Sequence, residues 1–539
     1  MKPPGPNGTP RIEVPIQELE ALLEGARDAL GAEGYQKLKA AVDTLAYLTS
    51  LIEDQATTIQ KLRQLLFKPA STEKTDKVLD NAGVKPEGNK TGGGKAPRSK
   101  KGHGRNGAKS YTAAPRVPVA HASLSSGDAC PKCLQGKVYA QRDPGVLVRL
   151  VGRAPVEATV YELQKLRCGL CQEVFTAAAP PEAGDKKYDE TAASMIAVLK
   201  YGSGVPFYRL DKLQGNLGIP LPPSTQWGIV KETARPMRPA LEELIRQAAQ
   251  GEVLYNDDTV ARVLSLRREQ PEKGDDRTGV FTSGIVATRE GRKVALYFTG
   301  RQHAGENLAD VLRWRATGLS PPIQMSDALS RNAPKLADLM KILTANCNAH
   351  GRRQFVEIAD SFPEQCRYVL ESFRSVYYHD ALAAERKLSP EDRLHYHQEH
   401  SGPVMQQLHE WLTAQLAERN TEPNSRLGKA ISYLLRHWTK LTLFLREPNA
   451  PLDNNLVERA LKIAILNRKN ALFYKTLRGA EVGDLFMSLI HTCELNGANP
   501  WDYLTELQRH REALERTPAE WLPWNYRQTL ARLANEPAA

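Results

Sequence analysis

The segment that decides the fold runs from Pro451 to Tyr474 and reads PLDNNLVERALKIAILNRKNALFY. It opens with polar residues, of which Asp453 or Asn454 can serve as the N-cap of a helix. Apolar residues at helical spacing then fall on one face of that helix; they are Leu456, Ala460, Ile463 and Ala464. Glu458 projects away from this face toward a different surface. The segment therefore predicts an amphipathic helix with a carboxylate outside its apolar face.

Basic residues of the same segment indicate a role for that carboxylate. They are Arg459, Lys462, Arg468 and Lys469. A carboxylate that is fixed on a rigid helix and followed by cations suits a metal-ion site that acts on a polyanion. A solvated amphipathic helix would have the same pattern, so this segment alone leaves both interpretations open.

The composition indicates a soluble protein of several domains. A chain of 539 residues is too long for one hydrophobic core, so we expect three or more domains. Apolar residues make up 41% of the chain, no apolar run has transmembrane length, and the opening MKPPGPNGTP lacks the apolar core of a signal peptide. Lys+Arg 73 against Asp+Glu 62 gives a net charge of +11, which favours a polyanionic partner. Seven cysteines, four of them in two CxxC pairs, indicate a reducing cytosol and metal binding.

Residues 1–67 predict a helical segment with a coiled coil. Apolar residues recur every seven positions, and a second set fills the intervening seam. The first set is Leu38, Leu45, Ile52, Ile59 and Leu66, and the second is Ala41, Leu48, Gln55 and Leu62. Self-association to a homodimer or higher oligomer is one interpretation, and packing of the helix on its own domain is the other.

Residues 68–115 predict a basic flexible linker. Its central part, KPEGNKTGGGKAPRSKKGHGRNGAK, is rich in glycine and in basic residues and cannot bury a core. Lys100, Lys101 and Arg105 are candidates to lie along DNA phosphates and release counterions. A linker that only adds solubility would have the same composition.

Residues 116–185 predict a zinc ribbon. Cys130-Pro-Lys-Cys133 and Cys168-Gly-Leu-Cys171 each present two thiolates, and two such turns complete a tetrahedral site for one Zn²⁺. The β-rich stretches 146–151 and 158–166 would form a hairpin between the two turns. Four cysteine ligands leave no open position, so we expect this zinc to be structural.

Residues 186–250 predict a helical domain. The helix Val205–Asn216, the break GIPLPP and a helix capped by Ser224 resemble a helix-turn-helix with a long turn. The segment either reads DNA or is a helical hairpin that only packs.

Residues 251–350 predict a domain in which strands come first and then alternate with helices. The expected strands are 252–264, 280–287, 293–298, 323–327 and 342–347, and the expected helices are 306–315 and 333–340. The order β-β-β-α-β-α-β is that of an RNase H-like fold. Acids in buried strands are costly unless they are paired or bind cations, so Asp257 and Asp327 are candidate metal ligands, and Glu458 would complete the set. Residues 351–450 predict a helical insertion, 451–495 the last part of the catalytic domain, and 496–539 a helical tail.

Several blocks of the chain resemble insertion sequence 66-type transposases, which are DDE enzymes with an RNase H-like catalytic domain. The blocks are LRQLLFKPASTEK, GHGRNGAK, KYGSGVPFYRLDKLQGNLGI, YNDDT, CNAHGRRQF, PLDNNLVERALKIAILNRKNALF and CELNGANPWDYL. The resemblance implies a catalytic triad of Asp257, Asp327 and Glu458. This chain has Asp257-Asp258-Thr259 where the family usually has Asp-Glu-Thr, which leaves Asp257 or Asp258 as the first ligand. It has Ala-Leu-Ser-Arg after Asp327 where the family commonly has Gly-Tyr.

The resemblance also implies partners and a location. They are double-stranded DNA, accessory transposition proteins, and a bacterial cytoplasm with nucleoid association. Candidate phosphate contacts are Arg352, Arg353, Arg459, Arg468 and Lys469. Cys347 and His350 have CxxH spacing, but the family block explains them as the end of a buried strand.

The expected chemistry is phosphodiester cleavage and strand transfer with two Mg²⁺ or Mn²⁺ ions, which hard carboxylate oxygens prefer to zinc. Strand transfer itself is implied by the resemblance, because residue types alone do not separate it from nuclease action. The alternatives are a nuclease or resolvase without strand transfer and a non-catalytic zinc-containing DNA-binding protein.

Overall fold

The computed structural model describes residues 23–25, 34–36, 38–39, 109, 111, 114–141, 146–150, 152–168, 170–268, 277–335 and 341–535. The chain divides into two units, Met1–Lys77 and Val78–Ala539. Apart from Leu38, the leucine and isoleucine positions of the predicted coiled-coil seam lie outside the described residues. So do Lys100, Lys101 and Arg105 of the predicted linker.

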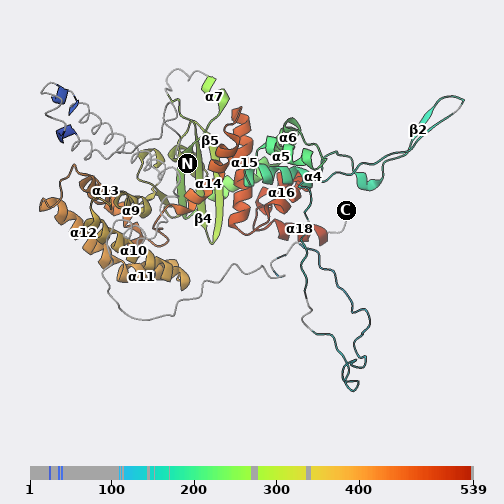
Figure 1. The fold of residues 1–539 in the computed structure, drawn as a ribbon, viewed down its shortest axis with the longest axis horizontal. Helices are drawn as coiled ribbons and strands as arrows, with labels where there is room; N and C mark the ends of the chain where they lie inside the picture. Colours follow the sequence, from blue (N-terminus) through green and yellow to red (C-terminus); the bar gives the residue numbers. More distant parts are fainter. Residues whose placement is uncertain are drawn as a thin grey trace. The chain divides into compact units, whose positions relative to one another are not determined.

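A mixed five-stranded sheet forms the centre of the second unit (Figure 1). Its strands are β3 (Val253–Val260), β4 (Phe281–Arg289), β5 (Arg292–Gly300), β6 (Ile323–Ser326) and β7 (Leu343–Asn346). The spatial order is β5-β4-β3-β6-β7, with the first three strands antiparallel and β6 and β7 parallel to β3. Glu290 and Gly291 both have positive φ and make the tight turn between β4 and β5, so the predicted hairpin is confirmed.

The helix α15 (Leu477–Leu495) takes the place of a further strand beside β5. Backbone N–H groups at alternate positions of β5 donate to polar side chains that are spaced four residues apart. Three of these side chains lie in α15, and the fourth, that of Asn496, directly follows it. The pairs are Thr299 to Asp484 (2.7 Å), Tyr297 to Ser488 (3.0 Å), Ala295 to Thr492 (3.1 Å) and Lys293 to Asn496 (3.2 Å). The spacing matches because four helical residues rise about 6 Å and two strand residues about 6.7 Å. The helix therefore satisfies and covers this sheet edge.

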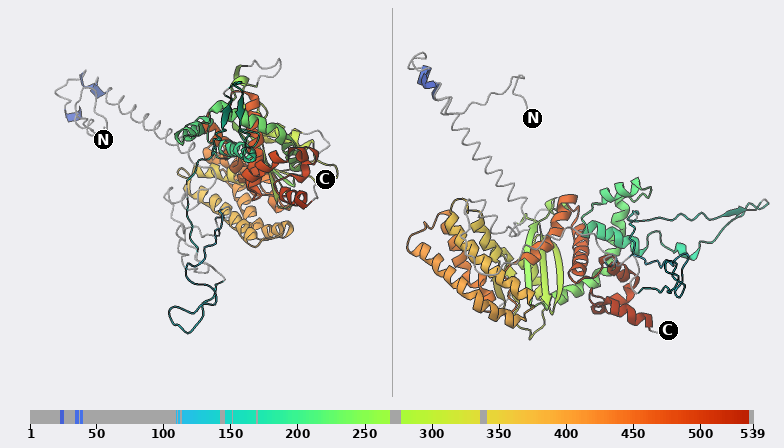
Figure 2. Two further views of the ribbon diagram at one scale, coloured as in Figure 1. Left: turned by 90° about the vertical axis from the view of Figure 1, so that its right-hand side faces the viewer. Right: turned by 60° about the horizontal axis from the view of Figure 1, so that its bottom comes forward.

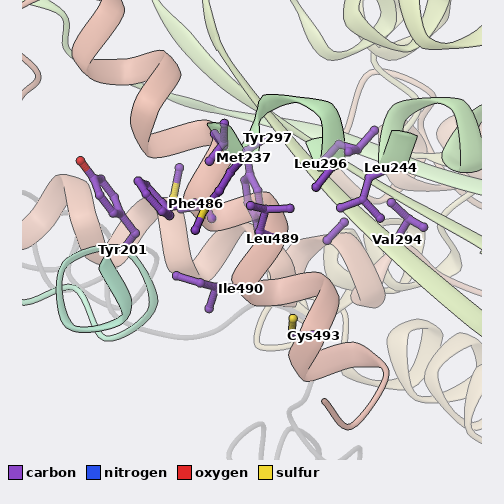
Figure 3. Packing of buried hydrophobic residues seen from close by; sticks show 14 of the residues in the cluster. Tyr201, Met237, Leu244, Val294, Leu296, Tyr297, Phe486, Leu489, Ile490 and Cys493 are labelled. Carbon is purple, nitrogen blue, oxygen red and sulfur yellow. The ribbon is translucent and has the colours of Figure 1, made fainter. Parts of the chain in front are cut away.

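The helices before the sheet share one hydrophobic core with it. They are α4 (Glu190–Ala197), the π-helical η3 (Val198–Gly202), α5 (Phe207–Asn216) and α6 (Pro223–Ala249). In Figure 3, Met237 and Leu244 of α6 lie with Leu296 of β5 and Phe486 of α15. The expected start of α6 is corrected, because Ser224 lies inside the helix, and Pro222 at the N-cap makes no side-chain cap.

The predicted insertion is helical and packs on the parallel strands. Its helices are α9 (Asn348–Val356), α10 (Pro363–Glu385), α11 (Pro390–His400), α12 (Gly402–Ala417) and α13 (Arg426–Leu441), followed by the short η5 (Leu443–Leu445). Met325 and Ala345 of the strands share a second core with Phe373 and Leu434 of these helices. Figure 2 shows the insertion at one side of the sheet and the helices around α15 at the other.

The remaining elements connect and close this unit. They are α7 (Leu264–Arg268), α8 (Ala304–Leu312), η4 (Ser330–Asn332), α14 (Asn455–Ala471), α16 (Pro500–Arg509), α17 (Arg511–Arg516), η6 (Pro518–Glu520) and α18 (Tyr526–Asn535). The described part of the predicted tail, residues 496–535, contains α16, α17, η6 and α18. The expected helix 333–340 lies largely outside the described residues, and positions 333–335 are not helical.

The cysteine-rich region differs from its prediction. Its strands are β1 (Lys165–Arg167) and β2 (Val174–Thr176), which form an antiparallel hairpin around the second CxxC turn, and η2 (Pro181–Ala183) follows. The described residues 146–150 and 158–164 form no strand, so the hairpin expected between the two CxxC turns is wrong. These residues are exposed, and β propensity without a partner strand or a face to bury does not make a sheet.

Candidate active site

The parallel pairing of β3 and β6 brings two predicted acids together. Asp257 lies on β3, and Asp327 directly follows β6. Asn332, which ends η4, donates from Nδ2 to Oδ1 of Asp257 (3.3 Å) and to Oδ1 of Asp327 (2.5 Å). One buried amide therefore joins the two carboxylates.

A network of buried amides holds Asn332 in place. Gln324 Nε2 and Asn256 Nδ2 both donate to the Asn332 carbonyl oxygen, at 2.8 and 2.7 Å. Gln324 Nε2 also lies 2.9 Å from Asn256 Oδ1. All three side chains are buried. The sequence signal for this network is small: Asn256 follows the apolar start of β3, and Gln324 lies between Ile323 and Met325 of β6.

Asp258 belongs to a different pair. Its side chain is 1% exposed, and its Oδ2 lies 2.8 Å from Nδ1 of His303 at the start of α8. Its Oδ1 lies 3.3 Å from the Arg331 guanidinium. Asp258 therefore holds the side chains of His303 and Arg331. Asp257 instead shares the hydrogen-bond donor Asn332 with Asp327.

Glu458 lies in the first turn of α14, which packs closely on the sheet. A Cβ added at Gly284 of β4 would lie 2.9 Å from Cδ2 of Leu461 and 3.3 Å from Val457, so a larger residue there would require Leu461 to shift. Asn454 occupies the N-cap position without capping, and its Nδ2 donates instead to the Asn256 carbonyl oxygen (3.3 Å). Asp453 accepts from the Asn455 N–H (3.1 Å).

The carboxylate of Glu458 faces Cys347 and His350. Cys347 directly follows β7 and is fully buried, and His350 lies in α9. His350 Nδ1 lies 3.7 Å from Glu458 Oε1, and ligand atoms of all three residues lie within 4.8 Å of one another. In the part of the chain that the structure describes, this is the one cluster of three or more His, Cys, Asp or Glu groups at such distances. Asp257, Asp327 and Glu458 therefore interact electrostatically, but their ligand atoms do not all lie within 4.8 Å of one another.

Electrostatics couples the three acids. Burial, and next the charge of Asp327, raises the pKa of Asp257 to about 7. Burial also raises the pKa of Glu458, with Asp453 and Asp327 adding to it, while the Arg353 guanidinium opposes the rise. Buried carboxylates that repel one another fit a cation between them.

Several buried polar atoms at the site have no hydrogen-bond partner among the described residues. They include His350 Nδ1, Glu458 Oε1, and Nε and Nη2 of Arg353. An unpaired buried polar group costs about 1–3 kcal/mol. The carboxylate oxygen fits a cation, and the guanidinium N–H groups fit an anion such as a phosphate.

The predicted phosphate contacts differ in accessibility. Arg459 and Lys469 are exposed on α14. Arg468 is half-buried and donates to Thr259 Oγ1 (3.2 Å) and to the Val260 carbonyl oxygen. Arg352 is only 7% exposed, so the structure places it in the interior, away from a DNA surface.

The two CxxC turns have matching local geometry. Leu134 and Gln172, each four residues after the first cysteine of its turn, have positive φ, and their N–H groups donate to the Cys130 and Cys168 carbonyl oxygens. Backbone hydrogen bonds, first from Gly136 and from Cys171, lower the pKa of Cys133 and of Cys168. The structure does not bring three of these thiols within 4.8 Å of one another among the residues it describes.

Comparison with known proteins identifies the family. Residues 186–482 match the model of the transposase IS66 family, and the chain belongs to that family. Two proteins of Sinorhizobium fredii (strain NBRC 101917 / NGR234), the uncharacterized proteins y4jD and y4hP, are each 28% identical to it. The alignment with the first covers 67% of this chain and 71% of the relative, and that with the second 70% and 69%. In the described residues, no helix has the length and apolar character of a membrane span.

Proposed function

We propose that the chain cleaves transposon ends and joins them to target DNA, with Asp257, Asp327 and Glu458 as ligands of two Mg²⁺ or Mn²⁺ ions. Membership of a transposase family supports DNA processing, with double-stranded DNA as the partner. The sheet order, with an antiparallel first half and two strands parallel to the first, supports an RNase H-like catalytic domain. The observation that carries the proposal is that the charge of Asp327, which directly follows β6, adds to the raised pKa of both Asp257 on β3 and Glu458 on α14, so the three acids lie near one place.

Different residues of the site bind the metal ions and the DNA phosphates. Bound magnesium would activate the attacking hydroxyl and stabilise the leaving oxygen. Asp257 and Asp327, aligned by Asn332, hold one side of the cation site, and Glu458 holds the other. The free N–H groups of Arg353 bind the scissile phosphate. Arg459 and Lys469 contact the DNA backbone beyond it.

The proposal includes a structural zinc and self-association. The matching CxxC turns support one Zn²⁺ on Cys130, Cys133, Cys168 and Cys171, since each turn already stabilises a thiolate with backbone N–H groups. The heptad pattern supports a homodimer or higher oligomer, in which two active sites act on two DNA ends.

Substitution of the acids tests the chemistry. Asp257→Asn, Asp327→Asn and Glu458→Gln should each lower cleavage of a labelled transposon end by at least about a thousandfold, because each removes a cation ligand. Binding to the same DNA should stay within about threefold, because it depends on basic residues. Asp360→Asn, at an exposed acid, is the matched control and should cleave like the wild type.

Product analysis separates the alternatives. With free target DNA present, joined products are expected, whereas cleaved ends alone would indicate a nuclease or resolvase. Binding of transposon ends by the wild type without any cleavage would leave a non-catalytic DNA-binding protein, whereas wild-type cleavage by all three acid variants would contradict the proposed metal ligands. If Asp258→Asn abolished cleavage and Asp257→Asn did not, the first ligand would be Asp258.

A further inference from the structure

We propose that Cys347, His350 and Glu458 form a second cation site that takes Zn²⁺ or a similar transition-metal ion and withdraws Glu458 from the magnesium site. The binding of zinc stands on the geometry of this chain alone. Its competition with magnesium rests on the proposed function, because only there is Glu458 a magnesium ligand.

The geometry already approaches that of a metal centre. The three ligand atoms lie within 4.8 Å of one another, and His350 Nδ1 and Glu458 Oε1 are 3.7 Å apart. A tetrahedral zinc ion with bonds of about 2.0–2.3 Å holds its ligand atoms about 3.3–3.7 Å apart, so small side-chain rotations complete the site. Cys347 and His350 are fixed in the backbone by the end of β7 and the first turn of α9.

The facing polar atoms need an occupant. His350 Nδ1 and Glu458 Oε1 are both buried without a hydrogen-bond partner in the described part of the chain. His350 Nδ1 and Glu458 Oε1 lie 3.7 Å apart, which is too far for a hydrogen bond between them, and an imidazole nitrogen and a carboxylate oxygen can both bind a cation.

The donor set selects the metal. A thiolate, an imidazole nitrogen and one carboxylate oxygen suit zinc or cobalt, whereas Mg²⁺ prefers six oxygens. A thiolate and a carboxylate neutralise a divalent ion. Metal ions bind cysteine as the thiolate, so the binding of zinc by the Cys347 thiol releases its proton to solvent.

Other groups facing this site limit its strength. Arg353 repels a cation there, and the Asn454 N–H, 3.3 Å from Cys347 Sγ, stabilises the thiolate. The charge of Asp327 also reaches His350 and favours a cation. Three protein ligands and one open position are therefore consistent with a reversible site, unlike the four-cysteine site.

Metal content tests the binding. The full-length wild type is equilibrated with zinc, and unbound zinc is then removed. It should contain one more zinc ion per chain than either the Cys347→Ser or the His350→Gln variant. Cys366→Ser is the matched control, because Cys366 is equally buried and its pKa is also about 12, but it lies in α10 and is not one of the three clustered ligands. Cobalt bound in place of zinc should show a sulfur-to-cobalt absorption band that weakens in Cys347→Ser and not in Cys366→Ser.

The two proposals fail in different ways. Equal zinc content in the wild type, Cys347→Ser and His350→Gln would overturn the site, whatever the activity. Retention of the extra zinc in Glu458→Gln would overturn the role of Glu458. Inhibition of cleavage by zinc that rising magnesium relieves is the expected competition, and inhibition that magnesium does not relieve would overturn it. Absence of any cleavage would contradict the proposed function but leave the zinc measurement valid.

Discussion

At the residue scale, the site depends on an amide that sits between two acids. Asn332 donates to both Asp257 and Asp327, and its own carbonyl oxygen is held by Asn256 and Gln324. Without a cation, this amide offsets part of the repulsion between the two carboxylates. With a cation, it fixes the direction in which their remaining oxygens point. Asn332 is therefore a positioning residue.

Asn332→Ala should raise the magnesium concentration needed for half-maximal cleavage and have a smaller effect on the stability of the fold. Loss of hydrogen bonds to charged groups costs about 1.5–3 kcal/mol, which corresponds to about 10- to 150-fold in the magnesium concentration needed for half-maximal cleavage. The measurement is a magnesium titration of cleavage, with melting temperature alongside.

The control for this experiment is Asn420→Ala, at an exposed amide after α12. It should titrate like the wild type. If the Asn332 variant lost stability while its magnesium titration stayed unchanged, the side chain would have a structural role only.

At the element scale, the contact between α15 and β5 places an acid in the interior. Asp484 accepts hydrogen bonds from the Thr299 N–H and the Thr299 hydroxyl, both at 2.7 Å. Burial raises its pKa from 3.8 to about 7. The helix thus completes the hydrogen bonds of the sheet edge with a group whose ionised form is costly there.

The pH dependence of stability follows from this carboxyl. Its pKa is higher in the folded than in the unfolded protein, so its contribution to the free energy of unfolding is greatest below about pH 4 and declines as the pH rises to about 7. Asp484→Asn removes this titration. We expect the free energy of unfolding of the wild type, relative to that of the variant, to fall by about 2–3 kcal/mol between pH 5 and pH 8. The measurement is urea denaturation of both proteins at the two pH values.

Glu515→Gln, at an exposed acid of α17, serves as the comparison and should follow the wild type at both pH values. Parallel stability curves for wild type and Asp484→Asn would show that Asp484 is ionised in the folded protein at both pH values.

At the scale of the whole molecule, a transposase acts on two DNA ends, and the heptad pattern offers a way to hold two active sites together. Deletion of residues 1–67 should shift the mass measured by light scattering toward one chain, because it removes the apolar seam. Cleavage of a single end should persist, whereas joining of paired ends should fall. An unchanged mass would contradict self-association through this segment.

The sequence by itself determined the strands of the central sheet and the candidate acids. The strands β3 to β7, the turn at Glu290 and Gly291, and the helix carrying Glu458 follow from local patterns, because periodicity and turn preference are properties of neighbouring residues. Asp257 and Asp327 stood out because an acid next to a buried strand needs a partner.

Only the tertiary structure decided what these acids contact. The pairing of Asp257 with Asn332 depends on the register between β3 and β6. The meeting of Glu458 with Cys347 and His350 depends on how closely α14 approaches the sheet, which Gly284 permits. The hairpin expected between the two CxxC turns is wrong for the same reason, because residues 146–150 and 158–164 have no partner strand, whereas Lys165 and Leu166 are in β1 and pair with β2. Contacts between distant segments are set by packing, which no local pattern encodes.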